Sequence, residues 1–304
     1  MLRVALGQPE REFSSCYEMK ETLGKGKYGE VKKAVHLDTK QVFAVKIINK
    51  KIMSQSELLS LRLEIEIGGR VCHPNVIQMK EVFETQDEVF LILEYLEGGD
   101  LYSHLKTYED RQMPEHVASQ VLHQLAMALY YLKSEGIVHR DLKPENVMLS
   151  GKFSKDGVPV VKIMDFGLST ILGNGELARD PFGTLTYVAP EILFDEAYAF
   201  QVDVYSLGSL YFQMLSGRLP FNVKSEKEMV LLVTQQTPKY DKGFLGVSRD
   251  TVSLLKYMLE KEPERRASIE EVLKHDTIAQ DLAPRRESYL LGWPNLALFA
   301  TSPE

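Results

Sequence analysis

The chain has 304 residues, of which 44% are hydrophobic and 26% charged, as in folded globular proteins and unlike disordered, collagen-like or coiled-coil chains. Its 43 acidic and 36 basic residues leave a formal net charge of −7, which argues against a nucleic-acid partner, because such binding neutralises phosphates with basic side chains. The acidic balance instead suits a partner that carries positive charge or brings its own cations.

Cysteine usage and hydropathy bear on where the protein resides. Cys16 and Cys72 are too few for a disulfide framework, so we expect a reducing compartment and a cytoplasmic protein. No apolar run approaches the roughly 20 residues of a membrane span, and residues 1–10 break too early for a signal-peptide core. We therefore expect no membrane span.

The first part of the chain is predicted to be rich in strands. Residues 1–12 are expected to form a loose N-terminal leader. Residues 13–96 carry short β-rich runs, with strands predicted over 44–48 and 89–93 and one helix over 56–71. The run Glu-Gly-Gly-Asp at 97–100 breaks this pattern and is the best internal boundary.

The second part of the chain, residues 97–278, is predicted to be helical. Apolar positions at spacings of three and four predict helices over 114–134, 202–215, 251–259 and 269–275. Residues 279–304 are expected to form a C-terminal tail, which would be the start of a regulatory segment. A strand-rich half followed by a larger helical half predicts an α+β fold of two lobes.

A glycine-rich segment, Leu-Gly-Lys-Gly-Lys-Tyr-Gly-Glu-Val at 23–31, contains the pattern G-x-G-x-x-G-x-V. Glycines let the backbone approach phosphate oxygens and direct amide N–H groups at them. Dinucleotide-binding folds use a similar pattern to open a helix, but residues 31–35 are strand-like, which favours a loop between two strands. Taken alone, the segment fits a nucleotide loop or a plain hairpin turn.

Lys46 follows within the apolar strand 44–48. A lysine there is costly unless it is paired or faces a ligand, and Glu64 on the next helix is the natural partner. The alternative is a lysine whose ammonium group reaches out from the strand edge to water.

Three further segments carry polar groups at fixed order. Residues 139–146 read His-Arg-Asp-Leu-Lys-Pro-Glu-Asn, residues 165–167 read Asp-Phe-Gly after a short strand at 160–164, and residues 189–191 read Ala-Pro-Glu. Together with the glycine-rich loop and Lys46, they occur in the order and spacing of eukaryotic protein kinases. The chain resembles this family from about residue 13 to 278. The resemblance implies the two-lobed protein kinase fold, with a small β-rich N-lobe containing one main helix and a larger α-helical C-lobe.

The resemblance also implies an ATP- and Mg²⁺-dependent serine/threonine protein kinase, which transfers the γ-phosphoryl group of ATP to Ser or Thr hydroxyls of protein substrates. Lys46, fixed by Glu64, would hold the α- and β-phosphates. Asp141 would orient the substrate hydroxyl, and Lys143 would neutralise the transferring group. The metal ligands would be Asn146 and Asp165. The catalytic set so implied is Asp141, Lys143, Asn146, Lys46 and Thr184, of which Lys143 and Thr184 mark serine/threonine rather than tyrosine kinases.

The residues implied to surround the nucleotide come from both lobes. Val31, Ala44 and Met148 would sandwich the adenine, residues 94–96 would form the hinge, and Leu93 would be the gatekeeper. The full set is Leu23, Gly24, Lys25, Gly26, Gly29, Val31, Ala44, Lys46, Glu64, Leu93, Glu94, Leu96, Asp100, Glu145, Met148 and Asp165. Two structural pairings are implied as well, that of Glu191 with Arg266 and that of Asp203 with the backbone of segment 139–141.

Segments 138–146, 165–170 and 215–221 resemble the calmodulin- and calcium-dependent kinases. The sequence contains no EF-hand loop. Either the chain is an excised catalytic domain, regulated by a calcium sensor through missing regions, or it is a kinase without its own sensor. We expect a monomer.

The sequence gives some indication of which peptides the kinase would prefer. Asp100, Glu145 and the net charge favour peptides with basic residues near the target Ser or Thr. Gln213 counts against this preference, because arginine-directed kinases often carry an acid there. In the tail, Ser288 is either an autophosphorylation site, part of a segment that occupies the peptide groove, or part of a solvated linker.

Two positions suggest particular behaviour. Arg140 normally needs an anion from the activation segment, and Asp180 is hypothesised to replace a phosphorylated residue, the alternative being a solvated side chain. Gly68 stands where the family usually has a bulky apolar residue beside Phe166, which predicts a mobile helix end and an enlarged back pocket.

The rival interpretations are a pseudokinase, disfavoured because Lys46, Asp141, Asn146 and Asp165 are all present, and a dinucleotide-binding oxidoreductase.

Overall fold

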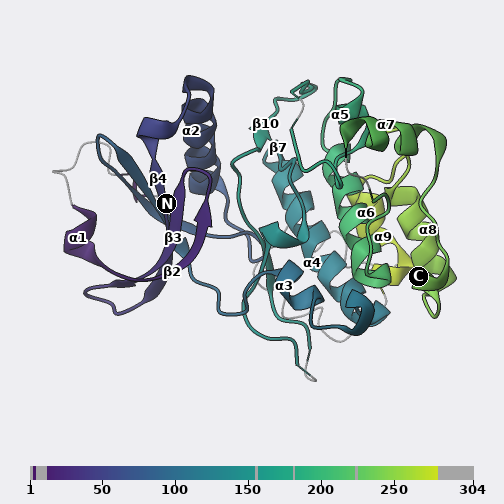
Figure 1. The fold of residues 1–304 in the computed structure, drawn as a ribbon, viewed down its shortest axis with the longest axis horizontal. Helices are drawn as coiled ribbons and strands as arrows, with labels where there is room; N and C mark the ends of the chain where they lie inside the picture. The colour runs from purple at the N-terminus through teal and green to yellow at the C-terminus, as the bar shows by residue number, and fades with distance from the viewer. Residues whose placement is uncertain (1–2, 5–11, 155–156, 181, 223–224, 280–304) are drawn as a thin grey trace, which may run out of the picture.

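A computed structural model describes residues 3–4, 12–154, 157–180, 182–222 and 225–279. It has a small lobe built on one sheet and a larger helical lobe (Figure 1), which confirms the predicted α+β, two-lobed architecture. The sheet contains β1 (Arg3–Val4), β2 (Tyr17–Gly26), β3 (Gly29–His36), β4 (Val42–Asn49), β5 (Met79–Glu84) and β6 (Glu88–Glu94). Their order across the sheet is β1-β5-β6-β4-β3-β2.

Five of these strands pair antiparallel, and β1 is the exception. Arg3 lies opposite Glu81 and Val4 opposite Val82, in parallel register with β5. The leader predicted over residues 1–12 therefore includes two residues that extend the sheet and are not loose. Residues 1–2 and 5–11 lie outside the described residues.

The register of the sheet decides which side chains face the cleft between the lobes. Val31 pairs with Lys46, and Ala44 pairs with Leu93. Since directly paired residues point to the same face, and residues two apart along β4 share that face, these four side chains lie together. The opposite face has its own apolar cluster, on which Phe13 of α1 (Phe13–Cys16) packs; its buried members are Tyr17, Ala34, Phe43, Val45, Phe83 and Ile92.

The helix of the N-lobe, α2 (Gln55–Arg70), was predicted at 56–71. Ser54 begins it through a capping box, in which its hydroxyl accepts from the Glu57 amide and the Glu57 carboxylate accepts from the Ser54 amide. The short η1 (Lys50–Ile52) precedes it. α2 contacts β5 and lies on the side of the sheet that is nearer the C-lobe (Figure 1).

Gly68 on α2 does not leave the predicted back pocket. The side chain of Met79, which is buried, fills the space: a Cβ added at Gly68 would lie 2.4 Å from the Met79 methyl group. The flexible thioether side chain thus substitutes for the missing apolar residue, as methionine does in irregular gaps. The prediction of a void at this position is wrong.

The C-lobe is a helical bundle around one large apolar core. Its longest helices are α4 (Glu115–Ser134) and α6 (Gln201–Ser216), predicted at 114–134 and 202–215, and α6 is buried on nearly every side. The remaining helices are α3 (Leu101–Leu105), η2 (Glu109–Arg111), η3 (Pro144–Asn146), α5 (Pro190–Leu193), α7 (Glu226–Gln235), η4 (Lys242–Phe244), α8 (Arg249–Met258), α9 (Ile269–Lys274) and α10 (Asp276–Ala279).

Two small antiparallel ribbons carry the polar segments at the cleft. They pair β8 (Val147–Leu149) with β9 (Val161–Ile163), and β7 (Ile137–Val138) with β10 (Thr170–Ile171). Because segment 139–146 lies between β7 and β8, and segment 165–167 between β9 and β10, the two ribbons hold both segments side by side. None of the helices in the described part of the chain is long and apolar enough to cross a membrane.

Candidate active site

Lys46 on β4 joins the two lobes through its ammonium group. Its Nζ lies 2.7 Å from Glu64 Oε1 on α2 and 3.1 Å from Asp165 Oδ1 in the C-lobe. Burial alone would lower the pKa of Lys46, but the two carboxylates outweigh it and raise that pKa. Burial likewise pushes the pKa of Asp165 up, and Lys46 reverses the shift, so the carboxyl stays ionised. The pairing predicted for Lys46 and Glu64 is present.

Asp141, Lys143 and Thr184 form a closed triangle of polar contacts. Lys143 Nζ lies 2.7 Å from Asp141 Oδ2 and donates to Thr184 Oγ1 at 2.8 Å. The Thr184 hydroxyl in turn donates to Asp141 Oδ1 at 2.6 Å. Asn146 Nδ2 donates to the Asp141 main-chain oxygen at 2.8 Å and to its Oδ2 at 2.9 Å. All four predicted catalytic residues of the C-lobe therefore meet at one carboxylate.

Asp203 on α6 holds the backbone of the catalytic segment, as predicted. Its two carboxylate oxygens accept from the amides of His139, at 2.7 Å, and Arg140, at 2.8 Å. Arg140 and Asp165 both have positive φ, 68° and 66°. Such strained backbone persists only where the surroundings over-determine it, and here the Asp203 carboxylate supplies part of that constraint.

The glycine-rich segment is the β2–β3 hairpin, as its sequence context predicts, and not the start of a helix. Its glycines differ in the space around them. A Cβ at Gly29 would lie 1.9 Å from the Ile47 main-chain oxygen, so Gly29 is required by close packing against β4. A Cβ at Gly24 would meet nothing within 4 Å, and Leu23, Lys25 and Gly26 are exposed as well. The open side of the loop is therefore the side of residues 23–26.

Three of the residues predicted around adenine share one face of the sheet, and the fourth, Met148, lies on β8. Val31, Ala44, Leu93 and Met148 are apolar and half-buried, as expected of a surface that a planar ring could cover. A backbone bridge places Asp100 beside Met148.

Four predicted polar or hinge residues interact with neighbouring groups. Asp100 caps α3, where both of its carboxylate oxygens accept hydrogen bonds from Ser103. The Glu94 carboxylate pairs with Lys162 at 2.8 Å, and Leu96 packs on the C-lobe core. Glu145 is exposed on η3, and its charge contributes to raising the pKa of Tyr187, after burial.

A contact between the glycine-rich loop and α2 was not predicted. The Tyr28 hydroxyl and the Lys27 ammonium both bind the Glu57 carboxylate, Lys27 at 2.8 Å. The Tyr28 ring packs against the core between the sheet and α2. Glu57 lies two helical turns before Glu64, so one face of α2 contacts both the glycine-rich loop and Lys46. The capping sequence from Ser54 to Glu57 was the available signal for this carboxylate.

Arg140 is buried, with 5% of its side chain exposed, and binds mostly neutral groups. Its donors reach the main-chain oxygens of Leu168, at 2.5 Å, and Ser169, at 3.2 Å, and the Tyr198 hydroxyl at 3.0 Å. The Asp180 carboxylate lies 3.8 Å away and is 71% exposed. The ion pair expected from the sequence is thus present but long, and sequence reasoning missed Tyr198.

Arg266 and Glu191 form the other predicted pair, which is present. Two parallel contacts of 2.6 and 2.9 Å join the guanidinium to the carboxylate, with both side chains inaccessible to solvent at 0% and 2%. This geometry ties α5 to the loop before α9.

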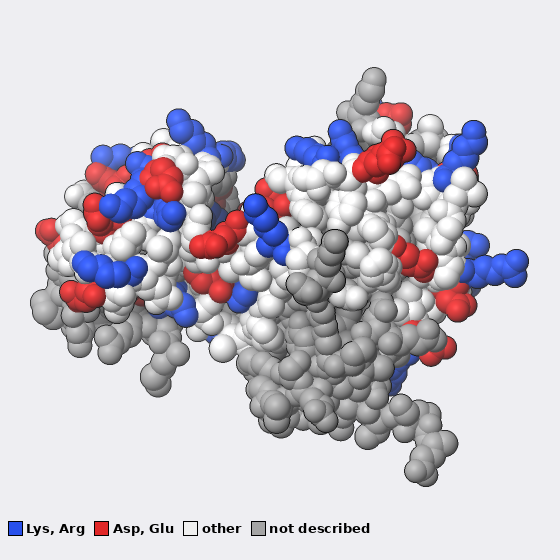
Figure 2. All heavy atoms as spheres, turned by 90° about the horizontal axis from the view of Figure 1, so that it is seen from below, with Lys and Arg blue, Asp and Glu red and all other residues white. Residues whose placement is uncertain are grey.

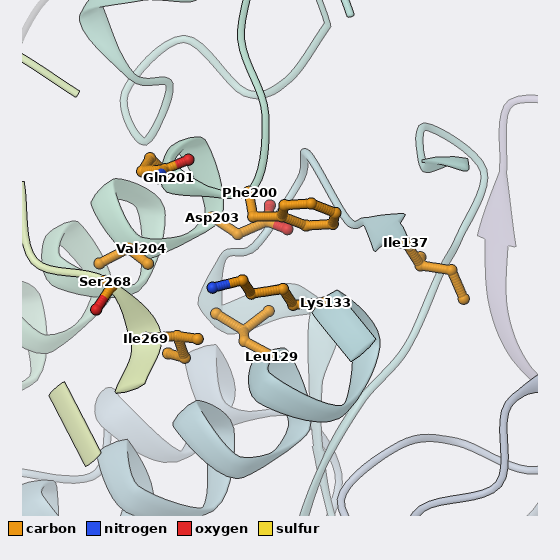
Figure 3. A pocket seen from close by; sticks show the side chains of 9 residues that line it. All are labelled: Leu129, Lys133, Ile137, Phe200, Gln201, Asp203, Val204, Ser268 and Ile269. Carbon is orange, nitrogen blue, oxygen red and sulfur yellow. The ribbon is translucent and has the colours of Figure 1, made fainter. Parts of the chain in front are cut away.

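A pocket in the C-lobe is lined by Asp203, which also holds the backbone of segment 139–141 (Figure 3). It is enclosed by α4, α6 and the start of α9, and its lining residues are Leu129, Lys133, Ile137, Phe200, Gln201, Asp203, Val204, Ser268 and Ile269. None of the predicted nucleotide-binding residues lines it.

Comparison with known proteins identifies the fold as a whole. The family model for the protein kinase domain matches residues 17–278. The chain belongs to the protein kinase family. This kinase is 35% identical over 272 residues to serine/threonine-protein kinase 17A of Oryctolagus cuniculus, across 88% of this chain and 68% of that protein. It is 34% identical to serine/threonine-protein kinase cds1 of Schizosaccharomyces pombe, across 90% of this chain and 65% of that protein.

A third relative, NUAK family SNF1-like kinase 1 of Homo sapiens, is 34% identical across 85% of this chain but only 38% of its own length. The kinase thus spans about two thirds of the first two relatives and much less of the third. Its similarity to serine/threonine kinases along most of its length assigns its catalytic domain to the serine/threonine class.

Proposed function

We propose that this kinase is catalytically active and transfers the γ-phosphoryl group of ATP to Ser or Thr hydroxyls of protein substrates. The observation that carries the proposal is the complete polar set at one site, with the Thr184 hydroxyl 2.6 Å from Asp141 Oδ1. A hydroxyl of the substrate's own type can therefore lie within hydrogen-bond distance of the carboxylate that would orient it.

The donor set fits Mg²⁺. Asn146 uses its amide nitrogen for Asp141 and so offers its oxygen, and Asp165 offers a carboxylate that stays ionised. The described residues contain no cluster of three or more His, Cys, Asp or Glu that could hold an ion alone. This agrees with Mg²⁺ at phosphoryl-transfer sites, which uses one or two protein ligands and takes its other oxygens from phosphates and water. When bound, Mg²⁺ would neutralise charge on the phosphates.

Each site residue of the chain then has a positioning or electrostatic role. Lys46, held by Glu64, would bind the α- and β-phosphates, with the glycine-rich loop above them. Asp141 would orient the attacking hydroxyl and accept its proton. Lys143, which contacts both Asp141 and Thr184, would stabilise negative charge on the transferring group. Phosphoryl transfer needs this positioning more than covalent chemistry.

A peptide phosphorylation assay tests the proposal. The wild-type kinase is expected to phosphorylate a Ser or Thr peptide in ATP and Mg²⁺, and Asp141→Asn to lower kcat by at least a hundredfold, since it removes the acceptor for the hydroxyl proton. Asp87→Asn, in an exposed ion pair with Lys51, is the matched control and is expected to keep full activity. Nucleotide binding without transfer by the wild-type protein would favour a pseudokinase and contradict the proposal.

For substrates, we propose a preference for basic residues near the target. The exposed Glu145 lies near Tyr187, whose hydroxyl donates to Gln213 Oε1 at 2.6 Å. Tyr187 thus uses one of the two lone pairs of Gln213 Oε1, and the exposed Glu145 is the acidic contact that we propose for a basic side chain. On the face shown in Figure 2, acidic and basic side chains are interspersed on both lobes, so recognition on that face would depend on individual acids and not on one acidic surface. Loss of arginine preference in Glu145→Gln is the test.

The resemblance to calmodulin- and calcium-dependent kinases supports a place in that group, with any calcium control supplied by regions beyond this chain. A monomeric state and a cytoplasmic location remain proposals from the sequence. Cys16 and Cys72, both free, are compatible with a reducing compartment. Ser288 lies outside the described residues, so autophosphorylation there also stays a prediction.

We further propose that Asp180 replaces a phosphorylated residue in the activation segment. Its carboxylate lies 3.8 Å from Arg140 Nη1. The kinase is then expected to stay active after phosphatase treatment, and Asp180→Ala to lose part of that activity. An unchanged Asp180→Ala enzyme would contradict this role.

A further inference from the structure

Tyr198 connects the activation segment to Arg140. It lies between α5 and α6, with only 3% of its surface exposed. Its hydroxyl accepts a hydrogen bond from Arg140 Nη1 at 3.0 Å and donates one to the Asp180 main-chain oxygen at 2.7 Å. Ala178 and Tyr198 also exchange two backbone hydrogen bonds, both of 2.9 Å. One buried residue thus holds both the arginine and the segment.

The segment held by Tyr198 leads directly to the catalytic triangle. Gly183 has a φ of 120°, and a Cβ there would lie 2.8 Å from the Arg140 main-chain oxygen, so the segment packs on the arginine's own backbone. The next residue is Thr184, which donates to Asp141. Tyr198 thus contacts Arg140 and Asp180, Gly183 packs on Arg140, and Thr184 contacts Asp141.

The surroundings of Arg140 indicate what the hydroxyl replaces. Among the described residues, the polar groups within hydrogen-bond distance of its guanidinium are two carbonyls and this hydroxyl, while the Asp180 carboxylate is beyond that distance and exposed to water. An exposed ion pair of this length is weak, because water and salt screen it. Burial raises the pKa of Tyr198, so its hydroxyl keeps the proton that it donates to Asp180.

We propose that Tyr198 is a positioning residue for phosphoryl transfer: its hydroxyl connects Arg140 to the activation segment at Asp180, and so replaces the contact that an added phosphate would make with this arginine. The proposal rests on the proposed kinase activity, and it places the main contribution on Tyr198 and a smaller one on the Asp180 carboxylate. No residue of the nucleotide site touches this hydroxyl. Its loss should therefore affect the transfer step more than ATP binding.

Tyr198→Phe tests this assignment, because it keeps the ring and removes the hydroxyl alone. We expect kcat of the phosphatase-treated kinase to fall about tenfold, the effect of one lost hydrogen bond to a charged group, with KM for ATP changed less than twofold. Exchange of the Ala178 amide with deuterium should accelerate. Asp180→Ala should lower kcat about threefold.

Tyr211→Phe is the matched control. It also removes a buried hydroxyl, one that bonds to Ser119 at 2.9 Å within the helical core, and it should change neither kcat nor Ala178 exchange. Unchanged kcat and exchange in Tyr198→Phe, or a larger effect of Asp180→Ala, would overturn the assignment. A wild-type enzyme without transferase activity would defeat the proposed function instead, and Ala178 exchange would then decide by itself whether the hydroxyl holds the segment.

Discussion

Arg266 and Arg140 are both buried arginines of the C-lobe, but their partners differ. Arg266 meets the Glu191 carboxylate in two parallel contacts, with both side chains inaccessible to water. Arg140 meets two carbonyls and the Tyr198 hydroxyl, and its nearest carboxylate is exposed at 3.8 Å. In the first arrangement the two buried charges compensate each other, and the pair connects two parts of the C-lobe. In the second, the guanidinium has only neutral groups within hydrogen-bond distance among the described residues, and two of these, the carbonyls of Leu168 and Ser169, belong to the activation segment.

Removing the charge of Glu191 should have the largest effect on stability. Glu191→Gln leaves the Arg266 cation buried without its counter-ion, which typically costs about 3–5 kcal/mol. The free energy of unfolding from urea titration measures it. Asp87→Asn, at an exposed ion pair, should cost less than about 1 kcal/mol. Equal losses of unfolding free energy in the two variants would contradict the view that Glu191 is the buried counter-ion of Arg266.

His73 shows a third solution, in which a buried basic side chain stays neutral. Its Nδ1 accepts from the Asn75 amide, and burial, with a smaller contribution from Lys162, lowers its pKa from 6.5 to about 4. Between pH 6.5 and 4 the unfolded chain therefore binds a proton that the folded chain does not. Stability should fall by up to about 1.4 kcal/mol per pH unit as the pH drops through this window. In His73→Gln, urea titrations at pH 7 and pH 5 should differ less than in the wild type; an equal difference would contradict the assignment.

Arg140→Met should destabilise the fold less than Glu191→Gln. The groups left behind are two carbonyls and a hydroxyl, not an unpaired charge, which corresponds to about 1–3 kcal/mol. Activity should nevertheless fall sharply, because the activation segment loses its attachment. Urea titration and kcat of the same variant separate the two effects, and a stability loss as large as that of Glu191→Gln would erase the distinction between the arginines.

The smallest expected effect on stability is that of Asp180→Ala, below about 1 kcal/mol, because the ion pair is long and exposed. Its effect on kcat should shrink as salt is added, since screening already weakens the pair in the wild type. A salt-independent loss of activity would indicate that Asp180 acts through something other than its charge.

The sequence predicted the fold and most of the site because both depend on short, ordered segments. The hairpin after Gly24 and the helix of α4 follow from local spacing, and the pairs of Lys46 with Glu64 and of Arg266 with Glu191 follow from the family resemblance. Tyr198 could not be predicted, because a tyrosine in a loop carries no signal of the arginine 58 residues away that it contacts.

The prediction of a back pocket at Gly68 failed for the opposite reason. The absence of a side chain was legible in the sequence, but its replacement by the side chain of Met79, from another element, was not. Tertiary contacts between residues distant in the sequence thus account for both Tyr198 and Gly68, whereas local patterns predicted the hairpin and the helices. The two residues of β1 were missed likewise, since their strand depends on the edge of β5.

The central claim is that Arg140 is positioned by the chain itself, so that transfer needs no phosphate on the activation segment. Its most direct test is the time course of peptide phosphorylation by phosphatase-treated kinase, with mass spectrometry of residues 168–189 at each time point. We predict full velocity from the first seconds with the segment unmodified. A lag that ends as phosphate accumulates on this segment would contradict the account.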